Sequence, residues 1–323
     1  MSATSIERLE DADSGQRETH VGPQKMRKET SREAPGAGYP MKTFTIDLDQ
    51  EPSTRYQHIV PEFNVTIWAF WEKYFARDPV LRGLLYALSW ERGDETAELQ
   101  GEIEGFAKAA RLPLRFLQAI QMLNVLETVM VPIVNGSRPV LPSGYEALSR
   151  LPSRGGCLGI IATISVDGTV YQARNLDMGP VDLFRSLVFN AVFERGGREV
   201  FRAQMMAGYM MVVTGAKFSG SDGFALARNT RYPDQPGGNA EMLHSLKTGV
   251  PLQGWTLRKI LETENSYDAA VAAISRSPFA SAEYVLVSGV RKGVVLSMNP
   301  SGVAHTQVLG GHHNFEQPPD YVI

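Results

Sequence analysis

The spacing of apolar residues separates a helical first half of the chain from a second half that is mainly sheet. An alternating stretch at 42–49 predicts an entry strand. Apolar residues then recur at spacings of three and four over 63–90, with a break near Asp78-Pro79, and predict amphipathic helices. The same spacing predicts helices over 95–110 and 114–131.

After Cys157 the apolar residues follow a period of two. Stretches 158–165 and 169–175 flank the turn pair Asp167-Gly168, which predicts a β-hairpin. The later pattern predicts strands at 205–214 and 223–228, helices at 242–248, 256–264 and 267–275, and closing strands at 283–288, 293–298 and 303–309. Because strands and helices do not alternate strictly, the order predicts an α+β fold rather than a βαβ one.

Composition is that of a globular protein that can bury a full core. The 323 residues are 43% hydrophobic, with 35 acidic and 32 basic side chains and a net charge of -3. This balance gives no whole-chain basic field for nucleic acid. We find no glycine-rich nucleotide fingerprint, phosphate loop or Gly-x-Ser-x-Gly elbow, so we expect no cofactor and disfavour the common serine hydrolases.

Changes in composition predict four regions. Residues 1–38 are polar and read as a disordered tail without a secretory or membrane-spanning apolar run. A mainly helical region follows at 39–131, then a linker rich in proline and glycine at 132–156, then a mainly sheet region at 157–323.

Three of the four tryptophans, Trp68, Trp71 and Trp90, lie in the first helical stretch. Core packing is the ordinary explanation for aromatic residues at helical spacing. The alternative is a lipid-facing surface, because tryptophan suits a site with one apolar and one wet side.

Cys157 is the only cysteine, so the chain cannot form an internal disulfide or a four-cysteine zinc site. A lone cysteine is either a small buried hydrophobic residue or a nucleophile, and its surroundings decide between the two.

The predicted hairpin brings charged residues to this thiol. A two-residue loop pairs Cys157 with Met178, and a four-residue loop pairs it with Leu176. Asp177 lies within about 4–8 Å of the cysteine in either register, and Arg174 is its neighbour on the same face. An ordinary surface pair between Arg174 and Asp177 is the alternative.

An arginine beside a thiol favours the thiolate and can stabilise an oxyanion, while a carboxylate can orient the arginine or an amine. The histidines show no cysteine-protease spacing. A base could come from the backbone, because cleavage of the Gly156–Cys157 bond would place a free α-amine, with a reference pKa near 8, beside the thiol.

Several segments resemble one family. The similar segments are Cys157 with 170–177, the Asn229-x-Arg231 element, the paired strands at 282–296 and the segment 43–56. Together they are similar to the acid ceramidase and N-acylethanolamine acid amidase family of N-terminal-nucleophile cysteine hydrolases.

The resemblance implies an αββα sandwich and a precursor that cleaves itself before Cys157 into an α-chain and a β-chain that stay together. It implies a lysosomal amidase of N-acyl lipids, with possible peripheral membrane contact and no cofactor. Cys157 would be the nucleophile, Arg174 and Asp177 would orient and stabilise, and Asn229 would contribute to the oxyanion hole. A turn residue is the other interpretation of Asn229.

Ceramide is the preferred substrate because the segment 46–49 looks closer to acid ceramidase, and N-acylethanolamine is the alternative. The chain also departs from the family pattern. Leu158-Gly159 replaces a Thr-Ser pair, the 132–156 linker is long, and Asn314 is a poor match to the family's late asparagine, with no arginine after it. The altered Leu158-Gly159 pair and the missing late elements leave a non-catalytic lipid-binding homologue as a further alternative. The missing signal peptide conflicts with the lysosomal location that the resemblance implies.

Overall fold

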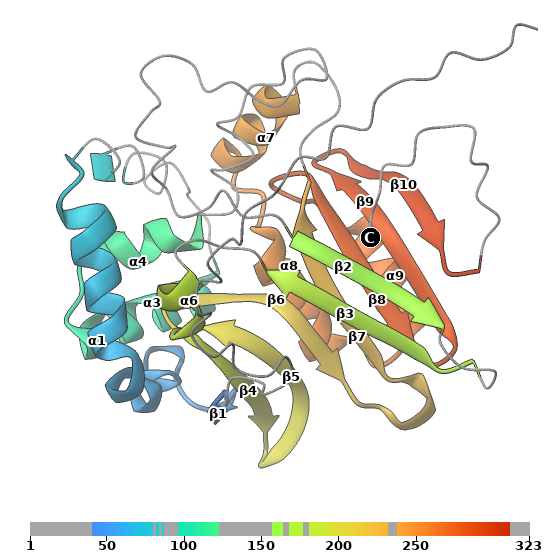
Figure 1. The fold of residues 1–323 in the computed structure, drawn as a ribbon, viewed down its shortest axis with the longest axis horizontal. Helices are drawn as coiled ribbons and strands as arrows, with labels where there is room; N and C mark the ends of the chain where they lie inside the picture. The colour runs from blue at the N-terminus through green and yellow to red at the C-terminus, as the bar shows by residue number, and fades with distance from the viewer. Residues whose placement is uncertain are drawn as a thin grey trace, which may run out of the picture. The chain divides into compact units, whose positions relative to one another are not determined.

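The computed structural model describes residues 41–79, 82–83, 86, 96–122, 157–163, 168–176, 181–231 and 238–310. Figure 1 shows helices from the first half of the chain beside a large sheet from the second half, which confirms the predicted α+β fold class. Within these residues no helix is long and apolar enough to cross a bilayer.

The first half contributes a strand and helices close to their predicted positions. They are β1 (Thr43–Asp47), α1 (Val60–Phe70), α3 (Ala97–Ala110) and α4 (Leu114–Gln121), with a π-helical extension of α1 (Trp71–Ala76) and 3-10 turns at Pro52–Thr54 and Gln57–Ile59. The Thr96 hydroxyl caps α3 by accepting the Leu99 N–H at 3.3 Å. The helix ends at Arg111, which is left-handed with φ 55°.

Aromatic residues of this half pack together as a core. The ring centroids of Phe70 and Phe116 lie 5.6 and 4.8 Å from that of Phe75, and Trp71 lies 5.0 Å from Phe116. Trp68 donates its indole N–H to a backbone carbonyl of α3 at 2.9 Å. The core-packing interpretation is confirmed for these two tryptophans, and the third lies outside the described residues.

Strands of the second half join β1 in an eight-stranded sheet with the order β1-β4-β5-β6-β7-β8-β9-β10. β1 pairs parallel with β4, and the later pairings are antiparallel. The strands after β1 are β4 (Val188–Arg195), β5 (Arg198–Met206), β6 (Tyr209–Lys217), β7 (Phe224–Thr230), β8 (Glu283–Gly289), β9 (Lys292–Asn299) and β10 (Gly302–Val308). The predicted closing meander is therefore confirmed.

The single strand predicted at 205–214 is wrong. The chain reverses direction at Ala207-Gly208, where Gly208 has φ 84°, so that Met205 lies in β5 and Thr214 in β6. A glycine adopts this left-handed conformation at no steric cost, which lets an unbroken apolar run form two strands.

Helices and a second sheet cover opposite faces of the large sheet. α8 (Gln253–Thr263) packs on β6 and α9 (Tyr267–Arg276) on β8. On the other face β2 (Cys157–Thr163) and β3 (Val170–Leu176) form a hairpin against β7 and β8, in front of the sheet in Figure 1. The remaining helices are α6 (Val181–Arg185) and α7 (Gly238–Lys247).

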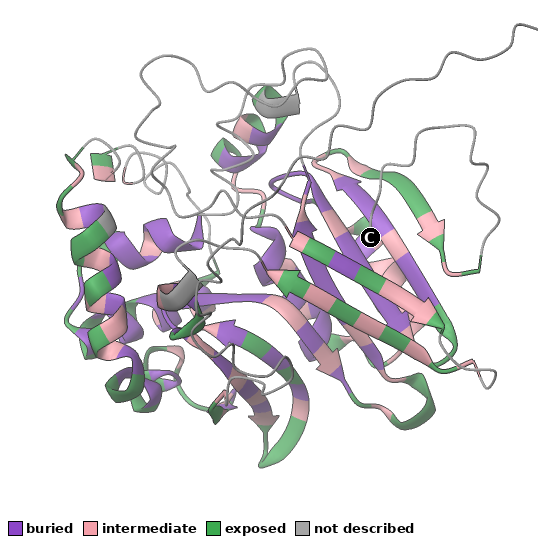
Figure 2. Cartoon of the chain, in the orientation of Figure 1, coloured by how far each residue is buried: buried purple, intermediate pink, exposed green. Residues whose placement is uncertain are grey.

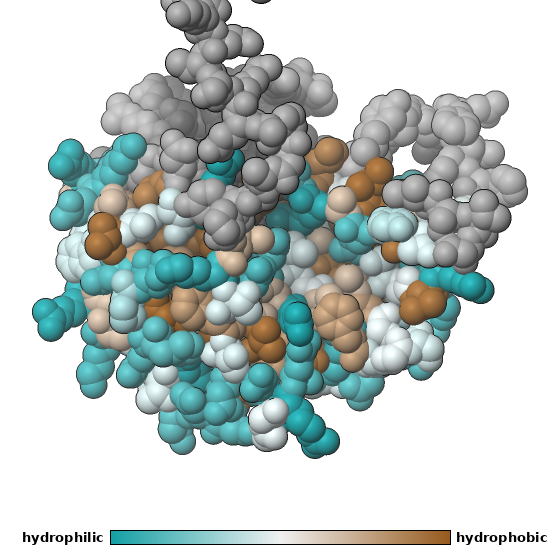
Figure 3. Space-filling model, turned by 60° about the horizontal axis from the view of Figure 1, so that its bottom comes forward, coloured by the Kyte–Doolittle hydropathy of each residue, from teal (hydrophilic) through white to brown (hydrophobic). Residues whose placement is uncertain are grey.

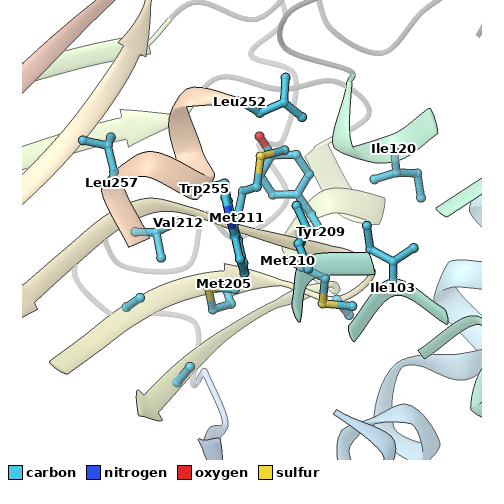
Figure 4. Packing of buried hydrophobic residues seen from close by; sticks show 14 of the residues in the cluster. Ile103, Ile120, Met205, Tyr209, Met210, Met211, Val212, Leu252, Trp255 and Leu257 are labelled. Atoms are coloured by element: carbon cyan, nitrogen blue, oxygen red, sulfur yellow. The ribbon is translucent and has the colours of Figure 1, made fainter. Parts of the chain in front are cut away.

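Of the predicted αββα sandwich, the described residues show one helical layer and two packed sheets. The buried residues, purple in Figure 2, follow the inner faces of these layers. Figure 4 shows residues of β6, among them Met210 and Met211, between Trp255 of α8 and Ile103 of α3. The core is thus shared by segments from both sides of Cys157.

Candidate active site

Cys157 is the first residue of β2, and the hairpin register fixes its neighbours. It pairs with Leu176, which is the register of the four-residue loop. Side chains two residues apart on a strand share a face, so Arg174 faces the same way as the thiol. Its Nη2 lies 3.3 Å from Cys157 Sγ and donates a hydrogen bond to it.

Arg174 is held in place from the large sheet. Its Nε donates to the backbone carbonyl of Arg228 and to Oδ1 of Asn229, both at 3.0 Å. Asn229 lies within β7 and is 3% exposed, so the turn-residue interpretation is wrong. Three of the four predicted site residues, Cys157, Arg174 and Asn229, therefore form one connected group.

The close approach of Asn229 leaves no room for a side chain at position 159, which is a glycine. A Cβ added to Gly159 would lie 2.8 Å from Asn229 Nδ2 and 2.7 Å from a methyl of Leu286. Gly159 pairs directly with Arg174 across the hairpin. Because position 159 has no side chain, the asparagine amide can approach the strand that carries the thiol.

Asp177, Gly156 and Asn314 lie outside the described residues. The role of Asp177 stays a prediction, as do cleavage at Gly156 and the predicted poor fit of Asn314. In the part of the chain that the structure describes, no cluster of three or more histidine, cysteine or acidic residues could hold a metal ion.

A buried ionic network lies on the helical side of β7, opposite the thiol, and the sequence analysis missed it. Arg228 is 2% exposed, and its Nη1 lies 3.0 Å from Oε1 of the fully buried Glu283. Arg228 also donates to the Tyr209 hydroxyl, and Glu283 accepts from Gln253 of α8. Successive side chains of β7 therefore point to opposite faces of the large sheet. Arg228 faces the helices, and Asn229 faces the hairpin.

Burial and neighbouring charges shift the pKa values of these groups. Burial lowers the pKa of the Arg174 guanidinium, the charge of Arg228 lowers it further, and Cys157 and Glu283 oppose the shift. Burial raises the pKa of Glu283 against the attraction of Arg228. A half-buried cation at the sulfur stabilises the negative charge that develops during attack on a carbonyl.

Two cavities adjoin the site on the hairpin side of the sheet. One, of about 500 Å³, reaches Arg174 and is lined by polar and apolar residues in similar proportion. The other, of about 490 Å³, lies toward the hairpin turn and shares Ala216 and Ala225 with the first. Apolar lining residues of the second cavity are Val170, Phe218, Phe224 and Val290.

A thiol at the start of a strand, bonded to an anchored arginine inside an α+β fold, is the arrangement of a cysteine hydrolase. Comparison with known proteins gives the relatives. The chain is 27% identical to the N-acylethanolamine-hydrolyzing acid amidase of Caenorhabditis elegans over 272 residues, which is 82% of this chain and 70% of that protein. The enzyme of the same name from Mus musculus is 26% identical over 81% of this chain and 65% of its own length.

An acid ceramidase, from Balaenoptera acutorostrata scammoni, is 28% identical over 42% of this chain and 37% of its own length. Among solved structures, a Caenorhabditis elegans N-acylethanolamine-hydrolyzing acid amidase ortholog matches with a TM-score of 0.40 and 29% identity, over 46% of this chain and 62% of that one. No protein-family model matches. The chain is similar to N-acylethanolamine-hydrolyzing acid amidases and to acid ceramidases, and the predicted resemblance is confirmed.

Proposed function

We propose that this protein is a self-processing cysteine amidohydrolase that cleaves the linear amide bond of an N-acyl lipid. The contact between Arg174 Nη2 and Cys157 Sγ, with the arginine anchored on Asn229, carries the proposal. The names of both groups of relatives support an amidohydrolase.

In the proposed reaction, the Cys157 thiol gives its proton to the free α-amine of the same residue, and Sγ attacks the carbonyl carbon of the amide. The carbon–sulfur bond forms, and the negative charge on the oxygen is stabilised by Arg174 or by the amide N–H of Asn229. The carbon–nitrogen bond then breaks, and the amine leaves with a proton from the α-ammonium of Cys157. Water hydrolyses the thioester to the fatty acid and restores the thiol. Asp177 would orient the arginine or the α-amine.

This chemistry needs cleavage before Cys157, into residues 1–156 and 157–323. A buried pair joins the two parts: Arg258 of α8 donates to both carboxylate oxygens of Glu102 of α3, at 2.5 and 2.7 Å, and both side chains are fully buried. Arg55 also donates to Glu102, at 2.9 Å. These contacts support two chains that stay associated after processing.

N-acylethanolamine is the first candidate substrate, because the relatives that cover most of this chain in the comparison above carry that activity in their name. Ceramide is the second. Its amine part has hydroxyl groups followed by a hydrocarbon chain, and the cavity at Arg174, which carries polar side chains, shares Ala216 and Ala225 with the more apolar cavity beside it.

A lysosomal location and peripheral membrane contact remain predictions from the resemblance. On the face shown in Figure 3, hydrophobic residues are scattered among hydrophilic ones.

The test is release of fatty acid from an N-acylethanolamine and from a ceramide with the same acyl chain, by wild type and Cys157→Ala. We expect release by wild type only. Binding of both lipids without release in either protein would contradict the proposal and support a lipid-binding homologue.

A further inference from the structure

A row of polar side chains crosses the face of the large sheet beside Arg174. Thr43, Asn190, Gln204 and Thr214 occupy directly paired positions on the adjacent strands β1, β4, β5 and β6. Directly paired residues point to the same side of a sheet, and four strands span roughly 14 Å at about 4.8 Å per strand. All four line the cavity of about 500 Å³, and we call them the polar row.

Two acceptor atoms in this cavity are buried without a hydrogen-bond partner. They are Oε1 of Gln172, on β3, and Oγ1 of Thr214, in the polar row. A buried polar atom without a partner costs about 1–3 kcal/mol, so each gains from a ligand that donates a hydrogen bond. Gln172 precedes Arg174 by two residues and shares its face of the strand, which puts these acceptors beside the proposed reaction centre.

Two guanidinium groups, those of Arg174 and Arg202, line the cavity, and the described lining residues include no carboxylate. Both are engaged elsewhere: Arg202 donates from Nε and Nη2 to Glu199 at 2.8 Å, and Arg174 donates to Cys157, Arg228 and Asn229. Hydroxyl and carboxamide groups can both donate and accept, so they match hydroxyl groups of an uncharged ligand. A hydrocarbon chain in the same place would leave these polar groups unpaired.

We propose that the polar row and Gln172 bind the amine part of the substrate, and that this part carries several hydroxyl groups and is larger than ethanolamine. The inference rests on the proposed function for the position of the amide at Cys157. The length of the polar row indicates how large the amine part is. Ethanolamine places one hydroxyl two carbons from the nitrogen, so it would reach only one or two residues of the row.

The experiment measures binding to full-length Cys157→Ala, which cannot turn over the ligand. Octanoyl amides of three amines are compared by calorimetry: hexylamine, ethanolamine and a linear aminohexitol. We expect the hexitol amide to bind at least about tenfold more tightly than the hexylamide, with the ethanolamide between them.

Two further substitutions in this background test the residues. Thr214→Val and Gln172→Met each remove one acceptor and should reduce the preference for the hexitol amide about three- to tenfold. Thr306→Val, at an exposed position of β10, is the matched control and should leave the preference for the hexitol amide unchanged.

The inference would be overturned if the three amides bound equally, if the hexylamide bound more tightly, or if the hexitol amide did not bind. It would also be overturned if Thr214→Val and Gln172→Met both kept the preference for the hexitol amide. Hydrolysis is a separate readout. If the ranking holds while wild type hydrolyses none of the three amides, the hydroxyl-binding site stands and the proposed function fails.

Discussion

The pair between Glu102 and Arg258 gives the clearest prediction about stability. The carboxylate of Glu102 accepts three hydrogen bonds, at 2.5 and 2.7 Å from Arg258 and at 2.9 Å from Arg55, and its side chain is fully buried. Glu102→Gln keeps the shape of the side chain, removes its charge and turns an N–H group toward a guanidinium.

Breaking a buried ion pair by removing one partner costs about 3–5 kcal/mol, because the charge that remains is less well compensated. Arg258 keeps the carboxylate of Glu262, at 3.1 Å, and Arg55 keeps that of Glu98. Each kcal/mol lowers the melting temperature of a domain of roughly this size by about 2–4 °C. Glu102→Gln should therefore melt about 6–20 °C below wild type.

The assay is thermal unfolding followed by circular dichroism, with Glu199→Gln as the matched control. Glu199 accepts two hydrogen bonds from Arg202, whose side chain is 59% exposed, so we expect this variant to melt within a few degrees of wild type. Similar melting temperatures for the two variants would refute the idea that a buried pair joins α3 to α8.

The remaining predictions concern the site and acid stability. Gly159→Ala should lower the unfolding free energy by about 1–3 kcal/mol and slow hydrolysis on the order of 100-fold, measured as kcat, because its methyl displaces Asn229. Burial opposes ionisation of Glu98, but hydrogen bonds from Lys259 and Arg55 outweigh it and lower the Glu98 pKa to about 2. The stability that Glu98 contributes is therefore present above its ordinary pKa of 4.5 and lost as the pH falls toward 2, so denaturant unfolding of Glu98→Gln should depend less on pH in that range.

Controls make these two predictions specific. Gly83→Ala adds the same methyl where no atom of the described residues lies within 4 Å, and it should leave kcat unchanged. Wild-type kcat in Gly159→Ala would contradict the placement of Asn229 beside β2. A larger acid dependence in Glu98→Gln than in wild type would contradict the stated direction of the pKa.

The sequence predicted the hairpin at Cys157 well because its turn and its alternation are local signals. Two loop lengths left two registers open, and both place Arg174 on the same face as the thiol. The structure selects the pairing of Cys157 with Leu176. The position of Asn229 was open because a residue at the end of a strand and one in the following turn look alike in sequence.

Features that depend on strand order could not be predicted. Thr43 lies next to Asn190 only because β1 pairs parallel with β4, a pairing between segments far apart in the chain. The network of Arg228 and Glu283 likewise needs the pairing of β7 with β8 and the position of α8. The reversal at Gly208 was hidden in a continuous apolar run.

The central claim, that Cys157 is the nucleophile of a self-processing hydrolase, is tested most directly by the mass of the denatured protein before and after incubation at acidic pH. The comparison is with Cys157→Ala, treated identically. We predict two chains that meet between Gly156 and Cys157 in the wild type, and one intact chain in the variant. An uncut wild-type chain, or the same cut in both proteins, would contradict the claim.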